Sequence, residues 1–160
     1  MKKSTKYEST VKDAKTLESV IPKQLAEYTT RALSKLNEAL GSDVGGYVVN
    51  RLHMSHEELR EALAAEQIDG VALAIYNIEK RGQSVVIGDQ TGIGKGRQAA
   101  AMIRYGLLSG YLPIFFTDRY TLFSDMYRDC KALGIKEARP LVVNAGVSVV
   151  DFDHVVEQKA

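Results

Sequence analysis

A short apolar run, a glycine-rich turn and an alanine-rich segment follow one another in this 160-residue chain, and this order most constrains its fold. Val85–Gly88 predicts a buried strand, and Lys95–Leu108 predicts a helix. Between them, Gly92 and Gly94 allow successive backbone N–H groups to turn inward around an anion. The helix start adds unpaired N–H groups and the positive end of the helix dipole. The order therefore predicts a site for the phosphates of a nucleotide.

The turn matches the phosphate-binding pattern G-x-x-x-x-G-K-[ST] with two departures. Asp89 takes the place of the first glycine, and Gly96 takes the place of the serine or threonine. That hydroxyl normally ligates Mg²⁺, so we expect either that other groups hold the metal or that metal-dependent hydrolysis is weakened. Lys95 is the predicted catalytic residue, because its ammonium suits the outer phosphates of ATP. The predicted nucleotide-binding residues of the turn are Asp89, Gln90, Thr91, Gly92, Ile93, Gly94, Lys95, Gly96 and Arg97.

Composition and charge exclude several classes of protein. Hydrophobic residues make up 45% of the chain, which suffices for an ordinary core, and the net charge is only +1. Any contact with DNA must therefore come from a local patch. The single Cys130 excludes an internal disulfide and falls on an apolar helix stripe, so we interpret it as a core residue. No apolar run suits a membrane span or a signal peptide, so the cytoplasm is the expected location.

The first half of the sequence predicts helices. Residues 1–10 are polar and are expected to form a disordered tail. Residues 11–81 are expected to form a helical segment, beginning with a helix over residues 11–40 that Pro22 divides. Proline suits the first turn of a helix, so a second piece would start there.

Two further helices are expected in this segment. Ser55 and Glu58 have the spacing of a capping box, which predicts the start of a short helix ending near Ala65. Apolar residues at helical spacing predict another helix over residues 68–80. Gly82 follows it and is expected to end it.

From residue 82 the pattern changes to alternating strands and helices. Further apolar runs predict strands over residues 112–117, 141–144 and 147–150, and a helix over residues 120–133. Strands that are apolar throughout are typical of a parallel sheet covered on both faces. In such sheets the ligand lies at the C-terminal ends of the strands, where the glycine-rich turn is found. Residues 82–160 are therefore expected to form the first part of an α/β nucleotide-binding domain.

The turn and its flanks resemble the strawberry notch family of superfamily 2 helicase-like ATPases. Residues 88–97 are similar to the loop of that family, which shares the glycine and arginine directly after the lysine. Residues 63–75 look like its glutamine motif, and residues 113–117 with 122–129 look like helicase motif Ia and its helix. The resemblance covers residues from about 12 to 150. It implies a P-loop NTPase fold with a RecA-like parallel sheet, incomplete here and preceded by the helical segment.

The resemblance also implies an activity, cofactors and partners. It implies ATP and Mg²⁺, hydrolysis coupled to the remodelling of DNA, and hydrogen bonds from the amide of Gln67 to adenine. The relatives it suggests are large phage and plasmid proteins that join this module to a DNA methylase region. Some of them are packaged in the virion and act against restriction. A Walker B acid pair, a second helicase lobe and an arginine finger are not evident by residue 160, so we expect an N-terminal part of a larger protein.

Arg97 and two residues after the second expected strand have alternative interpretations. Arg97 suits either a phosphate or an ion pair with Asp89. Thr117 and Arg119 lie where helicases touch the DNA backbone, and such contacts position a protein without reading sequence. The alternative for this pair is an ordinary helix cap and a solvated arginine.

Metal ligands stay unassigned from the sequence. Asp151 and Asp153 follow a short apolar run, as a Walker B acid does, but they lie close to the turn for a helicase lobe. We interpret them as part of a loop. His53 and His56 have no third ligand nearby and are interpreted as a loop residue and a helix residue.

Two functions from different classes follow. The first is the ATP-binding part of a helicase-like, DNA-directed ATPase, whose isolated N-terminal portion binds ATP but hardly hydrolyses it. The second is a non-catalytic binding or packaging module with a vestigial P-loop, motivated by Asp89 and Gly96. A small kinase using Asp151 would require an acceptor site that the sequence does not indicate.

Overall fold

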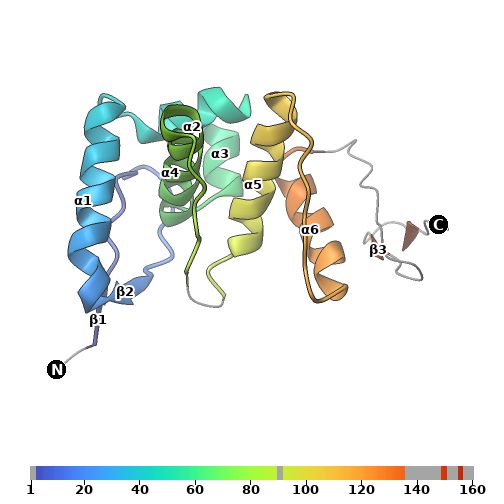
Figure 1. Cartoon of the computed structure of the whole chain (residues 1–160), viewed down its shortest axis with the longest axis horizontal. Helices are drawn as coiled ribbons and strands as arrows, with labels where there is room; N and C mark the ends of the chain where they lie inside the picture. Colours follow the sequence, from blue (N-terminus) through green and yellow to red (C-terminus); the bar gives the residue numbers. More distant parts are fainter. Residues whose placement is uncertain (1–2, 90–91, 136–148, 151–154, 157–160) are drawn as a thin grey trace.

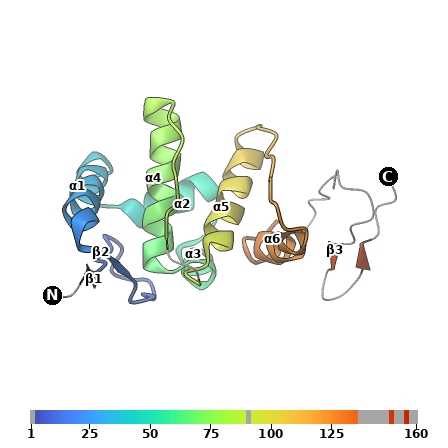
Figure 2. The same cartoon turned by 60° about the horizontal axis from the view of Figure 1, so that its bottom comes forward.

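The computed structural model describes residues 3–89, 92–135, 149–150 and 155–156. Its helices and strands, in chain order, are β1 (Ser4–Lys6), β2 (Val20–Pro22), α1 (Lys23–Ala39), α2 (Val44–Leu52), α3 (His56–Ala62), α4 (Ala65–Arg81), α5 (Lys95–Leu108), α6 (Thr121–Ala132), β3 (Val149–Val150) and β4 (Val155–Val156). Helices α1, α4, α5 and α6 lie in a row in which neighbours contact each other (Figures 1 and 2). Helix α2 packs against both α4 and α5.

Most helices begin and end close to the predicted positions. The Ser55 hydroxyl accepts a hydrogen bond from the Glu58 N–H at 3.1 Å, and the Glu58 carboxylate accepts one from the Ser55 N–H at 2.7 Å. This capping box opens α3, as predicted. Gly82 ends α4 in the left-handed conformation, with a φ of 60°. Helix α5 has the predicted bounds, and α6 lies within the predicted residues 120–133.

The prediction of a helix over residues 11–40 is wrong for its first part. Residues 11–19 are irregular, residues 20–22 form β2, and only α1, which starts after Pro22, is helical. The reason is a buried carboxylate on α4 that satisfies the backbone of this segment. Glu66 accepts hydrogen bonds from the Thr16 hydroxyl at 2.7 Å and from the Leu17 N–H at 3.0 Å. Backbone groups with such partners do not need helical ones.

Residues 1–10 were expected to be a disordered tail, but part of this segment forms β1, which pairs antiparallel with β2. A second carboxylate of α4, that of Asp69, attaches the segment to the helix. It accepts hydrogen bonds from the Tyr7 hydroxyl at 3.1 Å, from the Thr10 N–H at 3.3 Å and from the Thr10 hydroxyl. Asp69 is fully buried, and its burial raises the pKa of this carboxyl above the usual value.

The raised pKa predicts a pH-dependent contribution of Asp69 to stability. The folded state binds the proton more tightly than the unfolded state, so the contribution is complete below the unfolded pKa of about 4 and is lost as pH rises through the folded pKa. The unfolding free energy of the wild type minus that of Asp69→Asn should therefore fall as pH rises from about 4 through the folded pKa, by at most about 1.4 kcal/mol per pH unit. Urea unfolding at a series of pH values measures this difference. A flat difference would contradict the prediction, and Asp118→Asn is the exposed control.

The hydrophobic core lies between α2, α4, α5 and the end of α6. Its fully buried side chains include Val48, Leu52, Leu59, Ile68, Val71, Ile75, Ala100, Ala101 and Leu133. Arg104 of α5 holds two helix ends together, because its guanidinium donates to the Leu52 carbonyl at 2.6 Å and to the Leu133 carbonyl at 2.7 Å. Carbonyls at helix C-termini lack intrahelical partners, and cations near them are stabilising. The row of helices is thereby fixed around α5. No helix in the described part is long and apolar enough to span a membrane.

The predicted parallel sheet is not found among the described residues. Residues 83–89 and 111–117 pair with no strand among the residues that the structure describes, and the strand pairs it does describe, β1 with β2 and β3 with β4, are antiparallel. The predicted strand over residues 141–144 and the first half of the one over residues 147–150 lie outside the described residues, and the second half forms β3. A strand forms only where a neighbour supplies hydrogen bonds. As a result apolar side chains lie exposed, with Val86 at 92% and Phe116 at 85%.

Candidate nucleotide-binding loop

The glycine-rich turn joins the extended segment after α4 to the first residue of α5. Of its residues, Gln90 and Thr91 lie outside the described part. Gly92 and Gly94 have φ angles of 93° and 75°, a conformation that other residues rarely adopt. Gly94 is the N-cap of α5 and offers no side chain to the N–H groups of the first turn. No side chain therefore occupies the positive end of the α5 dipole, which is where an anion binds a helix.

Gln67 of α4 supports the loop through hydrogen bonds to its backbone. Its side chain is buried in the first turn of α4, where the amide oxygen accepts a hydrogen bond from the Ala64 N–H at 2.8 Å. The amide nitrogen donates to the carbonyls of Ile93 at 2.8 Å and Gly94 at 3.2 Å. A Cβ atom at Gly94 would lie 2.5 Å from this nitrogen, so the contact requires glycine. The amide is thus engaged on both sides, and a contact with adenine would require it to exchange these bonds.

Asp89 at the start of the loop is held by a second glutamine that sequence reasoning missed. Gln98 of α5 is 1% exposed and donates to the Asp89 carboxylate at 2.8 Å. Its amide oxygen lies against Gly70 of α4, where a Cβ atom would overlap it. A glycine inside a helix signals such a close approach, and Gly70 was the available sign of this contact. The ammonium of Lys95 donates to the Asp89 carbonyl at 2.8 Å, so the lysine at the end of the loop contacts the backbone at its start.

Arg97 has a partner that neither sequence interpretation included. Its guanidinium Nε donates to Oδ1 of Asp129 in α6 at 3.1 Å, and its Nη1 donates to the Ala62 carbonyl at 3.1 Å. The predicted ion pair with Asp89 is not formed, because the Asp89 carboxylate binds Gln98. The buried Asp129 also explains Gly96, since a Cβ atom there would overlap its Oδ2. Both departures from the usual loop pattern therefore have a structural partner.

The other predicted residues lie apart from the loop or outside the described part. The Thr117 hydroxyl accepts a hydrogen bond from the Arg119 N–H at 3.1 Å and so closes a local turn before α6. It is not the expected helix cap, because the N-cap of α6 is Tyr120 and no side chain caps this helix. Burial raises the pKa of the Cys130 thiol to about 11, so the thiol stays protonated and unreactive at neutral pH. Asp151 and Asp153 fall outside the described residues, within which no group of acidic, histidine and cysteine side chains suits a metal ion.

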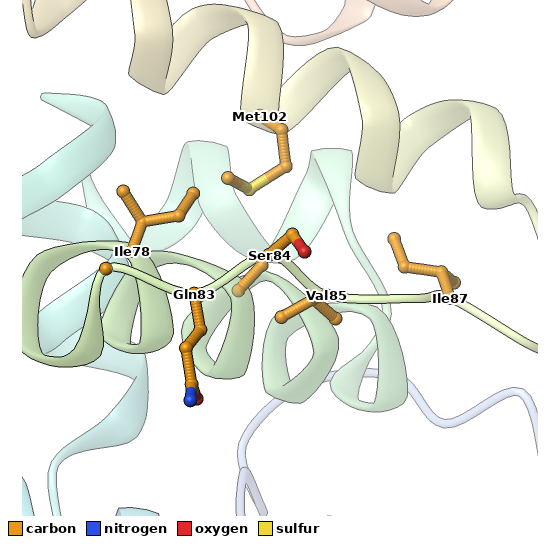
Figure 3. Close-up of a pocket in the computed structure, with 8 residues that line it drawn as sticks. Ile78, Gln83, Ser84, Val85, Ile87 and Met102 are labelled. Carbon is orange, nitrogen blue, oxygen red and sulfur yellow. The ribbon is translucent and has the colours of Figure 1, made fainter.

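A groove of about 450 Å³ lies beside the extended segment that leads to the loop (Figure 3). It is lined by Ala74, Ile78, Gly82, Gln83, Ser84, Val85, Ile87 and Met102, none of which is charged. Phosphates require N–H groups or cations, so this groove does not suit them. The glycine-rich loop, with the N-terminus of α5 and Lys95, is the candidate phosphate site.

Comparison with known proteins agrees with this geometry. A family model described as P-loop containing NTP hydrolase pore-1 matches residues 6–156, which is nearly the whole chain. Neither the curated proteins nor the solved structures yield a match. The match spans the loop, both glutamines that hold it, and the helix that supplies Asp129. The chain therefore belongs to the family described as P-loop containing NTP hydrolase pore-1.

Proposed function

We propose that residues 89–97 bind the phosphates of ATP together with Mg²⁺. The observation that carries this proposal is the pairing of a left-handed Gly94 at the N-cap of α5 with the lysine that follows it. The residues fit the ligand, because no side chain caps the first turn of α5 and a lysine is the first residue of that helix. When bound, Mg²⁺ neutralises charge on the phosphates.

Each loop residue has a defined task in this proposal. The Lys95 ammonium leaves the Asp89 carbonyl, to which it donates at 2.8 Å, and binds the outer phosphates. Gln67 keeps the Ile93 and Gly94 carbonyls directed toward its own amide, so that the N–H groups of the loop point toward the ligand. Hydrolysis requires water to attack the γ-phosphate, and an arginine from outside this chain would stabilise the developing charge. Without it the rate should be lower by about 10³–10⁵.

We further propose that the intact protein is a helicase-like, DNA-directed ATPase with a RecA-like parallel sheet. Residues 82–89 and 111–117 run in the same direction on either side of α5 in both views, as strands joined by a helical crossover do (Figures 1 and 2). Their exposed apolar side chains suit strands that other segments cover. The strawberry notch resemblance supports DNA as the partner and an antirestriction role in a phage or plasmid. Thr117 and Arg119 are the proposed contacts with the DNA backbone.

Replacing Lys95 tests the nucleotide site. Lys95→Ala should weaken binding of a fluorescent ATP analogue by about 10- to 100-fold, because a hydrogen bond to a charged group contributes about 1.5–3 kcal/mol. A fluorescence titration with the 160-residue chain measures the dissociation constants. Lys35→Ala, on the exposed side of α1, is the matched control and should bind as the wild type does. Equal affinity for Lys95→Ala and the wild type would refute the proposal and leave the non-catalytic binding or packaging module.

A further inference from the structure

A carboxylate from α6 stands at the position where the usual loop carries its Mg²⁺-binding hydroxyl. Gly96 is the second residue of α5 and replaces the serine or threonine of the usual pattern. The side chain at this position normally ends in the hydroxyl that ligates Mg²⁺. Here a Cβ atom would overlap Oδ2 of Asp129. An oxygen is therefore present at this place, but it comes from another helix.

The two oxygens of Asp129 have different surroundings. Oδ1 accepts hydrogen bonds from Arg97 Nε at 3.1 Å and from Arg128 Nη2 at 3.5 Å. Oδ2 accepts none from any residue that the structure describes. Asp129 as a whole is only 7% exposed. In the described part, every fully buried side-chain oxygen has a hydrogen-bond partner. Because Oδ2 has none, it keeps some contact with solvent beside Gly96. Two arginines thus hold the carboxylate in place and leave one oxygen for a cation.

We propose that Oδ2 of Asp129 replaces the missing hydroxyl as the protein ligand of the Mg²⁺ that accompanies the nucleotide. The inference rests on the proposed binding of ATP. Mg²⁺ prefers oxygen ligands and is usually held by one or two carboxylates together with substrate phosphates and water. Arg97 and Arg128 act as positioning residues, since their contacts with Oδ1 fix the direction of Oδ2. Glycine at position 96 is then a requirement of the metal site.

The dependence of nucleotide affinity on Mg²⁺ tests this inference without measuring hydrolysis. A fluorescent ADP analogue is titrated in EDTA and in Mg²⁺ for the wild type, Asp129→Asn and Asp125→Asn. Asp125 lies on the same helix, pairs with Arg128 at 2.8 Å and is the matched control. Mg²⁺ should strengthen binding by about tenfold or more in the wild type and the control, because charge-assisted contacts have this size, and by less than about twofold in Asp129→Asn.

The outcomes separate the inference from the proposed function. The inference would be overturned if Mg²⁺ increased the affinity for the analogue equally in the wild type and in Asp129→Asn. It would also be overturned if the wild type bound the analogue with the same affinity in EDTA and in Mg²⁺. In both cases nucleotide binding itself would stand. A wild type that fails to bind the analogue in EDTA and in Mg²⁺ would overturn the proposed function, and the inference with it.

A double variant covers the case in which Asp129→Asn does not fold. In Gly96→Ala/Asp129→Ala, the new methyl group at position 96 uses the room that the carboxylate leaves. Gly96→Ser/Asp129→Ala has nearly the same packing but carries the usual hydroxyl. The serine variant should regain a Mg²⁺ effect and the alanine variant should lack one. A full Mg²⁺ effect in the alanine variant would overturn the inference. Electron paramagnetic resonance of Mn²⁺ with ADP provides a second readout of the same ligand.

Discussion

Gln67→Leu is expected to weaken nucleotide binding by about 30- to 1000-fold, the largest effect of any single change considered. The amide of Gln67 holds the Ile93 and Gly94 carbonyls at 2.8 and 3.2 Å. Fixing the backbone of one residue costs about 1–2 kcal/mol, so releasing these two residues adds about 2–4 kcal/mol to the cost of binding. The variant also leaves the buried Ala64 N–H without its acceptor, which should lower the unfolding free energy by about 1–3 kcal/mol.

The choice of ligand separates this support role from a contact with adenine. Loop support predicts an equal loss for ATP and for inorganic tripolyphosphate, whereas an adenine contact predicts a loss for ATP alone. Isothermal titration calorimetry with both ligands measures the two losses. Gln24→Leu, an exposed change on α1, controls for the exchange of residue type. A folded Gln67→Leu variant with unchanged affinity for both ligands would contradict either role.

Gly96→Thr, which restores the usual residue of the phosphate-binding pattern, is expected to destabilise the chain by on the order of 3–5 kcal/mol. The threonine Cβ would overlap the Asp129 carboxylate. Overpacking costs about 1–3 kcal/mol, and displacing Asp129 also breaks its charged hydrogen bond with Arg97, worth about 1.5–3 kcal/mol. The side chain of Asp129 is 9% exposed, so water replaces this bond poorly. Denaturant unfolding measures the change.

Two further variants make the test of Gly96 specific. Gly45→Thr is the matched control, because a Cβ atom at Gly45 in α2 meets nothing within 4 Å. Its effect should stay within about 0.5 kcal/mol. Gly96→Thr/Asp129→Ala removes the overlap and should recover much of the lost stability. If Gly96→Thr unfolds at the same denaturant concentration as the wild type, the close approach of α5 and α6 at this point is wrong.

Local signals in the sequence predicted α3, α4, α5 and α6 well, whereas α2 was not predicted. The capping box at Ser55, the left-handed Gly82 and the bounds of α5 depend on neighbouring residues in the chain, and their signals are short-range. The irregular segment before α1 was predicted wrongly for the opposite reason. Its conformation depends on Glu66, a residue far along the chain whose carboxylate binds Thr16 and Leu17. No local pattern reveals such a partner.

The features of the candidate site also divide into those that depend on neighbouring residues and those that depend on distant ones. The sequence by itself determined the order of strand-like segment, glycines, lysine and helix, because these are neighbours in the chain, and the family match agrees with it. Only the tertiary structure decided that Gln67 supports the loop, that Gln98 holds Asp89, and that Asp129 lies over Gly96. The contacts of Gln67 and Asp129 join segments far apart in sequence, and their geometry follows from how α4, α5 and α6 pack. The contact of Gln98 with Asp89 spans only nine residues, but Gln98 is also held against Gly70 of α4. The spacing of residue types along the chain predicts local backbone conformation. A side chain from a distant helix contacts the loop only after the core has formed.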